Sequence, residues 1–429
     1  MKQDKILVGS ALFNWSETQR MIEISDALYQ MGYEIVFIGE GKYDYLLKEK
    51  PYIRQSVPFD VQWYTPKRIE KLLGMGQYGN QYASADEIRQ MIAEETAIIE
   101  KYQPACVLTG YRMTLTISAK LTGTPIVWCL AATLSKPYLQ QTLEKAKEFD
   151  NLKRSGNVPY QQIRALFEDK IACERLLGKP KTSKEWNRLL EEKNLPPLGC
   201  DFDIYTGDLN LMSDARELFG ELPESEHYQF IGPIWNNEKI EMPPVVGEVL
   251  AQNNGRKKVL ISIGSGGKKE LFQKILHATL GFDCDFFVSV VGILDESDLA
   301  AYPENYHFCD KFPLIEIVQC CDAALIQGGQ GTLYPVIVGK CPFVSLPATF
   351  EQRLNVENVQ RHSKCCEIIQ TYDISERSIQ TALQAILTQP EYRHNAAQLA
   401  ESIQAHFEDR RLAPRIAAQR IDRMLHGKT

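Results

Sequence analysis

The chain has 429 residues, of which 44% are hydrophobic and 24% charged, and its net charge is −7 at pH 7. A single hydrophobic core stops growing at about 250–300 residues, so this length predicts two domains. The acidic balance argues against a nucleic-acid-binding protein, which would carry a basic face. No apolar run approaches the ~18 residues of a membrane span.

The eleven cysteines and seven histidines do not form a metal-binding pattern. The cysteine count is odd, no Cys-x-x-Cys pair occurs, and no two histidines have the spacing of zinc ligands. We interpret the cysteines as small buried residues in a reducing compartment. This predicts a cytoplasmic protein without a metal site of its own.

The first half begins like a βαβ unit. An apolar strand at 5–10 is followed by a helix with apolar residues three and four positions apart, and Gly32 then precedes a second strand at 33–39. The crossover from one strand to the next implies a parallel sheet. Further buried strands are expected at 105–109 and 124–130.

The middle of the chain separates two α/β regions. Residues from about 136 to 194 are charged and have helical periodicity, so we expect a helical excursion from the first sheet. The polar, proline-containing segment 234–244 has the character of a linker, and we place the domain boundary near residue 240.

The second half contains another complete α/β pattern. A strand at 257–263, a glycine cluster, a helix and a strand at 286–291 open it, and the chain ends in an arginine-rich helix that starts near residue 389. Shorter strands are expected at 306–309, 323–326, 342–346 and 367–370. The fold class is therefore α/β, with two Rossmann-like doubly wound domains.

Two glycine clusters follow expected strands and precede expected helices. One is Gly328-Gly-Gln-Gly331; the other is Gly264-Ser-Gly-Gly267, with Lys268 directly after it. Glycine lets the backbone approach a ligand, and a helix N-terminus offers free N–H groups to an anion. Ligands of open α/β sheets bind at the carboxyl ends of the strands, so the two loops together predict a diphosphate site. The alternative is a pair of tight turns without a ligand.

With these motifs, the C-terminal half of the chain resembles the donor domain of the GT-B nucleotide-sugar glycosyltransferases, specifically the macrolide-type family of UDP- or dTDP-sugar transferases. Gln327-Gly-Gly-Gln-Gly-Thr332 matches the family's diphosphate motif His-Gly-Gly-x-Gly-Thr, with Gln in place of His. Residues 310–322 are similar to the segment whose backbone holds the base, and residues 346–355 to the segment that binds the sugar. The resemblance continues at 228–233 and covers most of the chain outside the excursion.

The resemblance implies two facing domains, with acceptor binding in residues 1–240 and donor binding in 241–429, including the C-terminal helix. The implied activity is a hexosyl transfer, inverting and metal-independent, from a UDP-sugar (favoured) or a dTDP-sugar to a small-molecule or lipid-like acceptor. No cofactor is expected besides the nucleotide sugar, which is a co-substrate. The predicted nucleotide-sugar site comprises Gly264, Ser265, Lys268, Phe312, Pro313, Leu314, Gln327, Gly328, Gly329, Gln330, Gly331, Thr332, Glu351 and Gln352.

The chain departs from the family pattern at four positions. Gln327 replaces the first His of the diphosphate motif, and Pro335 replaces a Glu that often holds the ribose. Glu17 stands where the family has the His that acts as general base, and Gly110 where an Asp supports that His. A carboxylate with an ordinary pKa of about 4.3 is a weak base unless burial raises that pKa. Glu17 is therefore a candidate for the base, and a helix-capping role is the alternative.

Acceptor contacts are predicted from Trp15 and Arg112, with packing as the alternative for Trp15. Two other functions stay open. One is a catalytically degenerate GT-B domain that acts as a partner or activator, and the other is a sugar-nucleotide 2-epimerase. We expect no nucleic-acid partner and no transmembrane segment, and we leave peripheral membrane contact, a monomer and a homodimer open.

Overall fold

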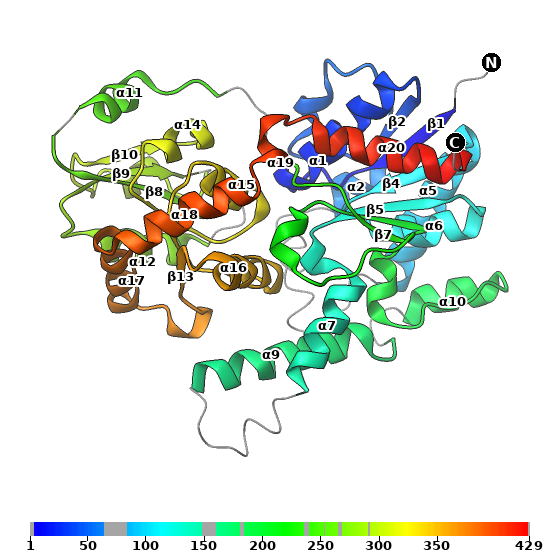
Figure 1. Cartoon of the computed structure of the whole chain (residues 1–429). Helices are drawn as coiled ribbons and strands as arrows, with labels where there is room; N and C mark the ends of the chain where they lie inside the picture. The colour runs from blue at the N-terminus through cyan, green and yellow to red at the C-terminus, as the bar shows by residue number, and fades with distance from the viewer. Residues whose placement is uncertain are drawn as a thin grey trace. The chain divides into compact units, whose positions relative to one another are not determined.

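A computed structural model describes residues 4–63, 84–147, 160–180, 184–235, 240–252, 254–264, 268–290 and 292–427. The chain forms two compact units, each with its own sheet (Figure 1). Unit 1 comprises Met1–Ile234 and Arg411–Thr429, and unit 2 comprises Trp235–Arg410. Ser265, one of the predicted donor-site residues, lies outside the described residues.

Unit 1 is built on a parallel seven-stranded sheet in the order β3-β2-β1-β4-β5-β6-β7. Its strands are β1 (Lys5–Gly9), β2 (Glu34–Ile38), β3 (Ile53–Gln55), β4 (Cys106–Thr109), β5 (Ile126–Leu130), β6 (Leu209–Met212) and β7 (Tyr228–Phe230). The chain order runs outward from β1 to β3 and then returns to β4 on the other side of β1. The boundary between β1 and β4 is therefore a topological switch point, where open α/β sheets bind ligands.

Helices cover both faces of this sheet. They are α1 (Trp15–Gln30), η1 (Asp44–Leu47), α2 (Pro58–Trp63), α5 (Ala85–Tyr102), α6 (Thr114–Thr122), η2 (Ala132–Leu134), α7 (Lys136–Ala146), α9 (Tyr160–Leu177), α10 (Lys184–Glu192), η3 (Asp201–Tyr205), η4 (Arg216–Phe219) and α20 (Leu412–His426). Along β1, Ile6 and Val8 enter one core cluster while Leu7 enters the cluster on the opposite face. Such two-sided burial explains why the strand is apolar throughout.

The predicted excursion contains α7, α9 and α10. Helices α7 and α9 pack against each other (Figure 1). Helix α10 packs against α5. Trp186 and Leu190 of α10 are buried in the core cluster that also contains Leu7. The excursion is thus anchored to one face of the first sheet.

Unit 2 is built on a parallel six-stranded sheet in the order β10-β9-β8-β11-β12-β13. Its strands are β8 (Lys257–Ser262), β9 (Cys284–Ser289), β10 (Tyr306–Cys309), β11 (Ala323–Ile326), β12 (Phe343–Ser345) and β13 (Cys366–Ile368). Its helices are α11 (Pro244–Ala251), α12 (Lys269–Thr279), α13 (Glu296–Leu299), α14 (Leu314–Gln319), α15 (Gln330–Val338), α16 (Phe350–Ser363), η5 (Thr371–Asp373), α17 (Glu376–Thr388), α18 (Pro390–Ser402) and α19 (Ala405–Glu408). The switch point of this sheet lies between β8 and β11. The prediction of two doubly wound α/β domains is confirmed.

The last helix belongs to a different unit from the one we expected. We placed the boundary near residue 240 and the C-terminal helix in the second domain, whereas residues from Arg411 onward belong to unit 1. Helix α20 lies alongside α1 (Figure 1). Its small apolar face, which includes Ala417 and Ile421, is buried in the same core cluster as Met21 and Ile24 of α1. Burial of this apolar face explains the placement.

Within the described ranges, no helix has the length and apolar character that crossing a membrane requires.

Candidate active site

Glu17 lies at the switch point of the first sheet. The loop after β1 places Ser10 beneath it, and the loop after β4 places Gly110 beside it; β1 and β4 are hydrogen-bonded neighbours in which Gly9 pairs with Thr109. The Ser10 hydroxyl donates to Glu17 Oε2 at 2.6 Å. Helix α1 is capped by Asn14, whose Oδ1 accepts the backbone N–H of Glu17 at 3.2 Å. The carboxylate itself makes no capping bond, so its side chain is available for another role.

Burial gives the Glu17 carboxyl group an unusual pKa. The residue is only 4% exposed. Burial raises the pKa of Glu17 from 4.5 to about 7, although the Ser10 hydroxyl, the Arg20 guanidinium and the backbone near Ala11 and Gly110 all act to lower it. A general base works best when its pKa lies near the operating pH. The structure therefore supplies the burial that the sequence argument required.

Because Gly110 has no side chain, there is room for Glu17 beside it. A Cβ atom at Gly110 would lie 2.9 Å from Glu17 Cγ and 3.2 Å from Glu17 Oε1. The two positions at which the chain departs from the family's His–Asp pair are thus in contact. A single carboxylate fills the place where two side chains were expected.

Aromatic side chains gather on the loops around Glu17. Trp15, at the start of α1, makes an edge contact with Tyr43 at a ring-centroid distance of 5.0 Å and lies 6.4 Å from Tyr45. Phe13 makes an edge contact with Tyr111 at 5.3 Å. Tyr45 is 45% exposed. These five residues, which we call the aromatic cluster, follow β1, β2 and β4 at the carboxyl edge of the sheet.

Arg112 does not reach a surface where it could contact an acceptor. Its side chain is fully buried, with Nη1 2.5 Å from Asp60 Oδ2 and Nε 2.6 Å from Glu95 Oε1. Burial raises the pKa of both carboxyl groups, and Arg112 opposes that shift. We therefore correct its assignment: Arg112 is a structural residue that neutralises two buried acids, and it is no longer proposed as an acceptor contact.

Gly264 and Gly328, the first glycines of the two clusters, follow neighbouring strands of unit 2. Gly264 follows β8 and Gly328 follows β11, and these strands are paired so that Ser262 is opposite Ile326. Both glycines have a left-handed backbone, with φ of +65° and +94°. Helix α12 begins after Lys268, which is exposed, and α15 begins after Gly329. Two helix N-termini therefore start at the switch point, as the diphosphate prediction requires.

At Gly328 only glycine fits. A Cβ atom there would lie 2.3 Å from Val356 Cγ1 and 3.1 Å from the Gln352 carbonyl oxygen, so α16 passes directly over the loop. The preceding residue, Gln327, is 3% exposed, and within the described part of the chain its Nε2 is buried without a hydrogen-bond partner. A buried amide donor without a partner is costly unless a ligand accepts its hydrogen bond.

The start of α16 is bonded to this loop. Asn355 Nδ2 donates to the Gly328 carbonyl at 3.3 Å and also to Glu351 Oε1. Gln352 Oε1 accepts the backbone N–H groups of Ala348 and Thr349 at 2.9 and 3.2 Å, which closes a capping box. The amide oxygen of Gln352 is thus used by the helix, and its Nε2 would lie 3.7 Å from a Cβ at Gly329. Only the Nε2 end remains available for a donor sugar.

The segment expected to hold the base lies at the same edge of the second sheet. Phe312 is buried, and Pro313 caps α14, which begins at Leu314 after the loop that follows β10. The Pro313 carbonyl accepts the N–H of Ile317 at 3.0 Å. At the start of α15, Gln330 is buried while Gly331 and Thr332 are partly exposed.

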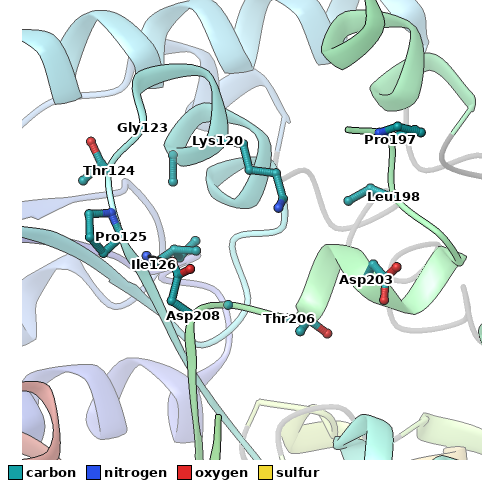
Figure 2. Close-up of a pocket in the computed structure, with 12 residues that line it drawn as sticks. Lys120, Gly123, Thr124, Pro125, Ile126, Pro197, Leu198, Asp203, Thr206 and Asp208 are labelled. Atoms are coloured by element: carbon teal, nitrogen blue, oxygen red, sulfur yellow. Dashed lines mark hydrogen bonds between the residues drawn. The ribbon is translucent and has the colours of Figure 1, made fainter. Parts of the chain in front are cut away.

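A cavity of about 420 Å³ in unit 1 was not predicted (Figure 2). It lies where β5 and β6 begin, at the edge opposite to Glu17. Its polar residues are largely engaged within the protein: Asp208 accepts the Ile126 N–H at 2.8 Å, and Asp203 pairs with Lys136 at 2.7 Å. Its walls come from residues between 119 and 126 and between 197 and 208, where no site was predicted.

Among the residues that the structure describes, no group of three or more His, Cys, Asp or Glu side chains is arranged to hold a metal ion.

Comparison with known proteins agrees with this geometry. Residues 273–418 match the erythromycin biosynthesis protein CIII-like C-terminal domain. A PGL/p-HBAD biosynthesis glycosyltransferase of Mycobacterium tuberculosis is 23% identical over 408 residues, or 95% of this chain and 90% of the relative. The kitacinnamycin glycotransferase structure has a TM-score of 0.67 at 14% identity and covers 98% of both chains. Spinosyn rhamnosyltransferase SpnG complexed with thymidine diphosphate has a TM-score of 0.57 at 14% identity and covers 94% of this chain and 96% of that chain.

Two doubly wound parallel sheets, each with candidate site residues at its switch point, define a GT-B fold. The chain is similar to glycosyltransferases of the macrolide type, as its motifs predicted.

Proposed function

We propose that the protein transfers a hexose from a UDP- or dTDP-sugar to a hydroxyl group of a small-molecule or lipid-like acceptor, with inversion and without a metal ion. The observation that carries this proposal is the buried Glu17 carboxyl group at the switch point of unit 1, with a pKa raised to about 7. A carboxylate with this pKa can take a proton from a hydroxyl near neutral pH, where an ordinary Glu is too weak a base.

The reaction requires few groups. The acceptor oxygen attacks the anomeric carbon, its proton passes to Glu17, and the bond to the diphosphate oxygen breaks as the nucleoside diphosphate leaves. The charge on the leaving group requires stabilisation by fixed donors. The N-termini of α12 and α15 and the free Nε2 of Gln327 are suited to that task.

The donor has two candidate nucleotides, UDP and dTDP. A structural neighbour was solved with thymidine diphosphate, which supports a dTDP-sugar, whereas the sequence motifs favoured UDP. Glu351 and Gln352, at the start of α16, are proposed to hold the sugar hydroxyls through a carboxylate and an amide N–H. Phe312, Pro313 and Leu314 are proposed to hold the base.

The acceptor is proposed to bind against the aromatic cluster. Trp15 and Tyr45 offer ring surface on the loops next to Glu17, and Tyr45 is 45% exposed. Aromatic rings give large apolar contact area and pack well against flat or apolar molecules. Trp15→Ala is therefore expected to raise KM for the acceptor and to leave nucleotide affinity unchanged.

Calorimetry with UDP and dTDP is the first test. We expect one of the two to bind, and Gln327→Ala to weaken that binding. The absence of binding at millimolar concentration would refute the enzyme proposal and favour the non-catalytic partner or activator. A panel of UDP- and dTDP-sugars, assayed for slow hydrolysis, then identifies the donor.

Glu17→Gln separates the base from the binding residues. The variant keeps the shape of the side chain but cannot accept a proton, so we expect transfer and hydrolysis to be lost while nucleotide affinity is retained. Transfer at the wild-type rate would exclude Glu17 as the base.

A further inference from the structure

The loop after β1 holds the Ser10 hydroxyl in one orientation. The Ser10 N–H donates to the Ile38 carbonyl of β2 at 3.2 Å, which fixes the backbone. The Ser10 hydroxyl oxygen accepts the Leu12 N–H at 3.4 Å. Leu12 has a left-handed backbone with φ of +43°, a strained conformation for a leucine. Because the oxygen receives this amide, its own proton is directed elsewhere.

That proton goes to Glu17. The Ser10 hydroxyl lies 2.6 Å from Glu17 Oε2 and 3.5 Å from the Thr18 hydroxyl, so the short contact to the carboxylate is the stronger bond. Both Ser10 and Thr18 are fully buried. The bond between Ser10 and Oε2 is therefore shielded from solvent.

The other carboxylate oxygen of Glu17, Oε1, has different neighbours. Glu17 Oε1 lies beside Gly110 and is buried without a hydrogen-bond partner among the described residues. The backbone groups of Ala11 and Gly110 lie close enough to the carboxyl group to lower its pKa, but neither meets the distance and angle of a hydrogen bond to Oε1. The two oxygens of one carboxylate are thus distinguished by their neighbours.

We propose that Ser10 is a positioning residue for Glu17: its hydroxyl occupies Oε2 and leaves Oε1, beside Gly110, as the oxygen that receives the acceptor's proton. The proposal rests on the proposed role of Glu17 as general base. In the family that the chain resembles, an acidic side chain supports the histidine base. Here the Ser10 hydroxyl takes part of that orienting role for Glu17.

The other polar groups near Glu17 have partners apart from Ser10. Arg20, one turn further along α1, donates to the Cys129 carbonyl of β5 at 3.3 Å. Cys129 is neutral, because burial raises the pKa of its thiol to about 12. Asp214, after β6, accepts the Ala132 N–H at 2.7 Å. A difference between wild type and a Ser10 variant therefore reports the loss of the Ser10 hydroxyl and of its contacts with Glu17, Leu12 and Thr18.

The test is a ¹³C NMR titration of the full-length protein labelled at the glutamate carboxyl carbons, with the Glu17 signal assigned by its loss in Glu17→Gln. A donor to the charged form lowers a pKa, so Ser10→Ala is expected to raise the pKa of Glu17 by about one unit. The ionised fraction then falls about tenfold at pH values well below that pKa. The acid limb of nucleotide-sugar hydrolysis should move by the same amount.

Ser25→Ala is the matched control. Ser25 is equally buried on α1, but its hydroxyl donates to the Met21 carbonyl at 2.6 Å. We expect no change in the Glu17 titration in this variant. Ser10→Cys, which keeps the size and offers a weaker donor, should give a smaller shift than Ser10→Ala and remains informative if the alanine variant does not fold.

The outcomes separate the two proposals. A Glu17 titration that is the same in wild type and Ser10→Ala, or that moves equally in Ser25→Ala, overturns the role of Ser10 while Glu17 remains the base. Retained transfer in Glu17→Gln overturns the base itself, whatever the serine variants show.

Discussion

Replacement of Glu17 by glutamine should stabilise the folded protein at alkaline pH. In the unfolded chain the carboxyl group ionises near pH 4.5, whereas in the folded chain its pKa is about 7. Between these values the folded state binds more protons than the unfolded state. The stability that protonated Glu17 contributes is therefore fully present below pH 4.5 and is lost as the pH rises through 7.

The magnitude follows from the two pKa values. Their difference corresponds to about 3 kcal/mol of folding free energy that wild type loses between pH 4.5 and pH 8. The glutamine side chain is neutral at every pH, so the variant loses none of this folding free energy. At pH 8 the variant is thus expected to be more stable by up to about 3 kcal/mol, which is about 6–12 °C in Tm for a unit of this size.

The measurement is a thermal melt of wild type and Glu17→Gln at pH 5 and pH 8. We expect similar melting temperatures at pH 5 and a higher value for the variant at pH 8. Glu100→Gln is the control, because Glu100 is an exposed residue of α5. Equal pH dependence in wild type and Glu17→Gln would refute the reasoning, since it would mean that Glu17 is ionised in the folded protein without cost.

Three further variants test other parts of the structure. Gly328→Ala should weaken UDP or dTDP binding at least tenfold and destabilise the protein by about 1–3 kcal/mol, because its methyl group would lie 2.3 Å from a valine of α16. The control is Gly255→Ala, where the backbone is also left-handed but the space around it is open, and this variant should keep full affinity in calorimetry. Arg112→Met should cost about 3–5 kcal/mol in urea unfolding, because it leaves two buried carboxylates without a cation; a loss below about 1 kcal/mol would contradict this role. Gly110→Ala should displace Glu17 and reduce transfer about 100-fold with nucleotide affinity unchanged, so a normal transfer rate would show that the carboxylate tolerates the shift.

Much of the architecture could be predicted because it depends on local patterns. The apolar strand before Gly264 and the one before Gly328 indicated two glycine clusters at one sheet edge, and the strand order confirmed that these two strands end at the same edge as neighbours. Parallel sheets have few topologies, so short motifs were sufficient. The C-terminal helix was misplaced because an amphipathic pattern does not show which core the apolar face enters.

The site was harder to predict, since side-chain roles depend on burial. Glu17 was a candidate from its position, but its raised pKa comes from surroundings contributed by β1, β4 and β5. Arg112 looked like a surface cation because Asp60 and Glu95 are distant in sequence. Ser10 carried no signal at all, because a serine after a strand is common and only its contact with Glu17 distinguishes it.

The return of the chain to its first unit bears on how this enzyme could be re-engineered. The second unit of a related protein cannot be exchanged at a single junction near residue 240, because everything after that point would include α20, whose apolar residues complete the core beside α1. Unit 2 is a segment inserted between two parts of unit 1, and a chimera has to be joined at both 234/235 and 410/411. Hybrids that keep the native α20 should remain folded, whereas those that replace it should expose an apolar stripe on α1.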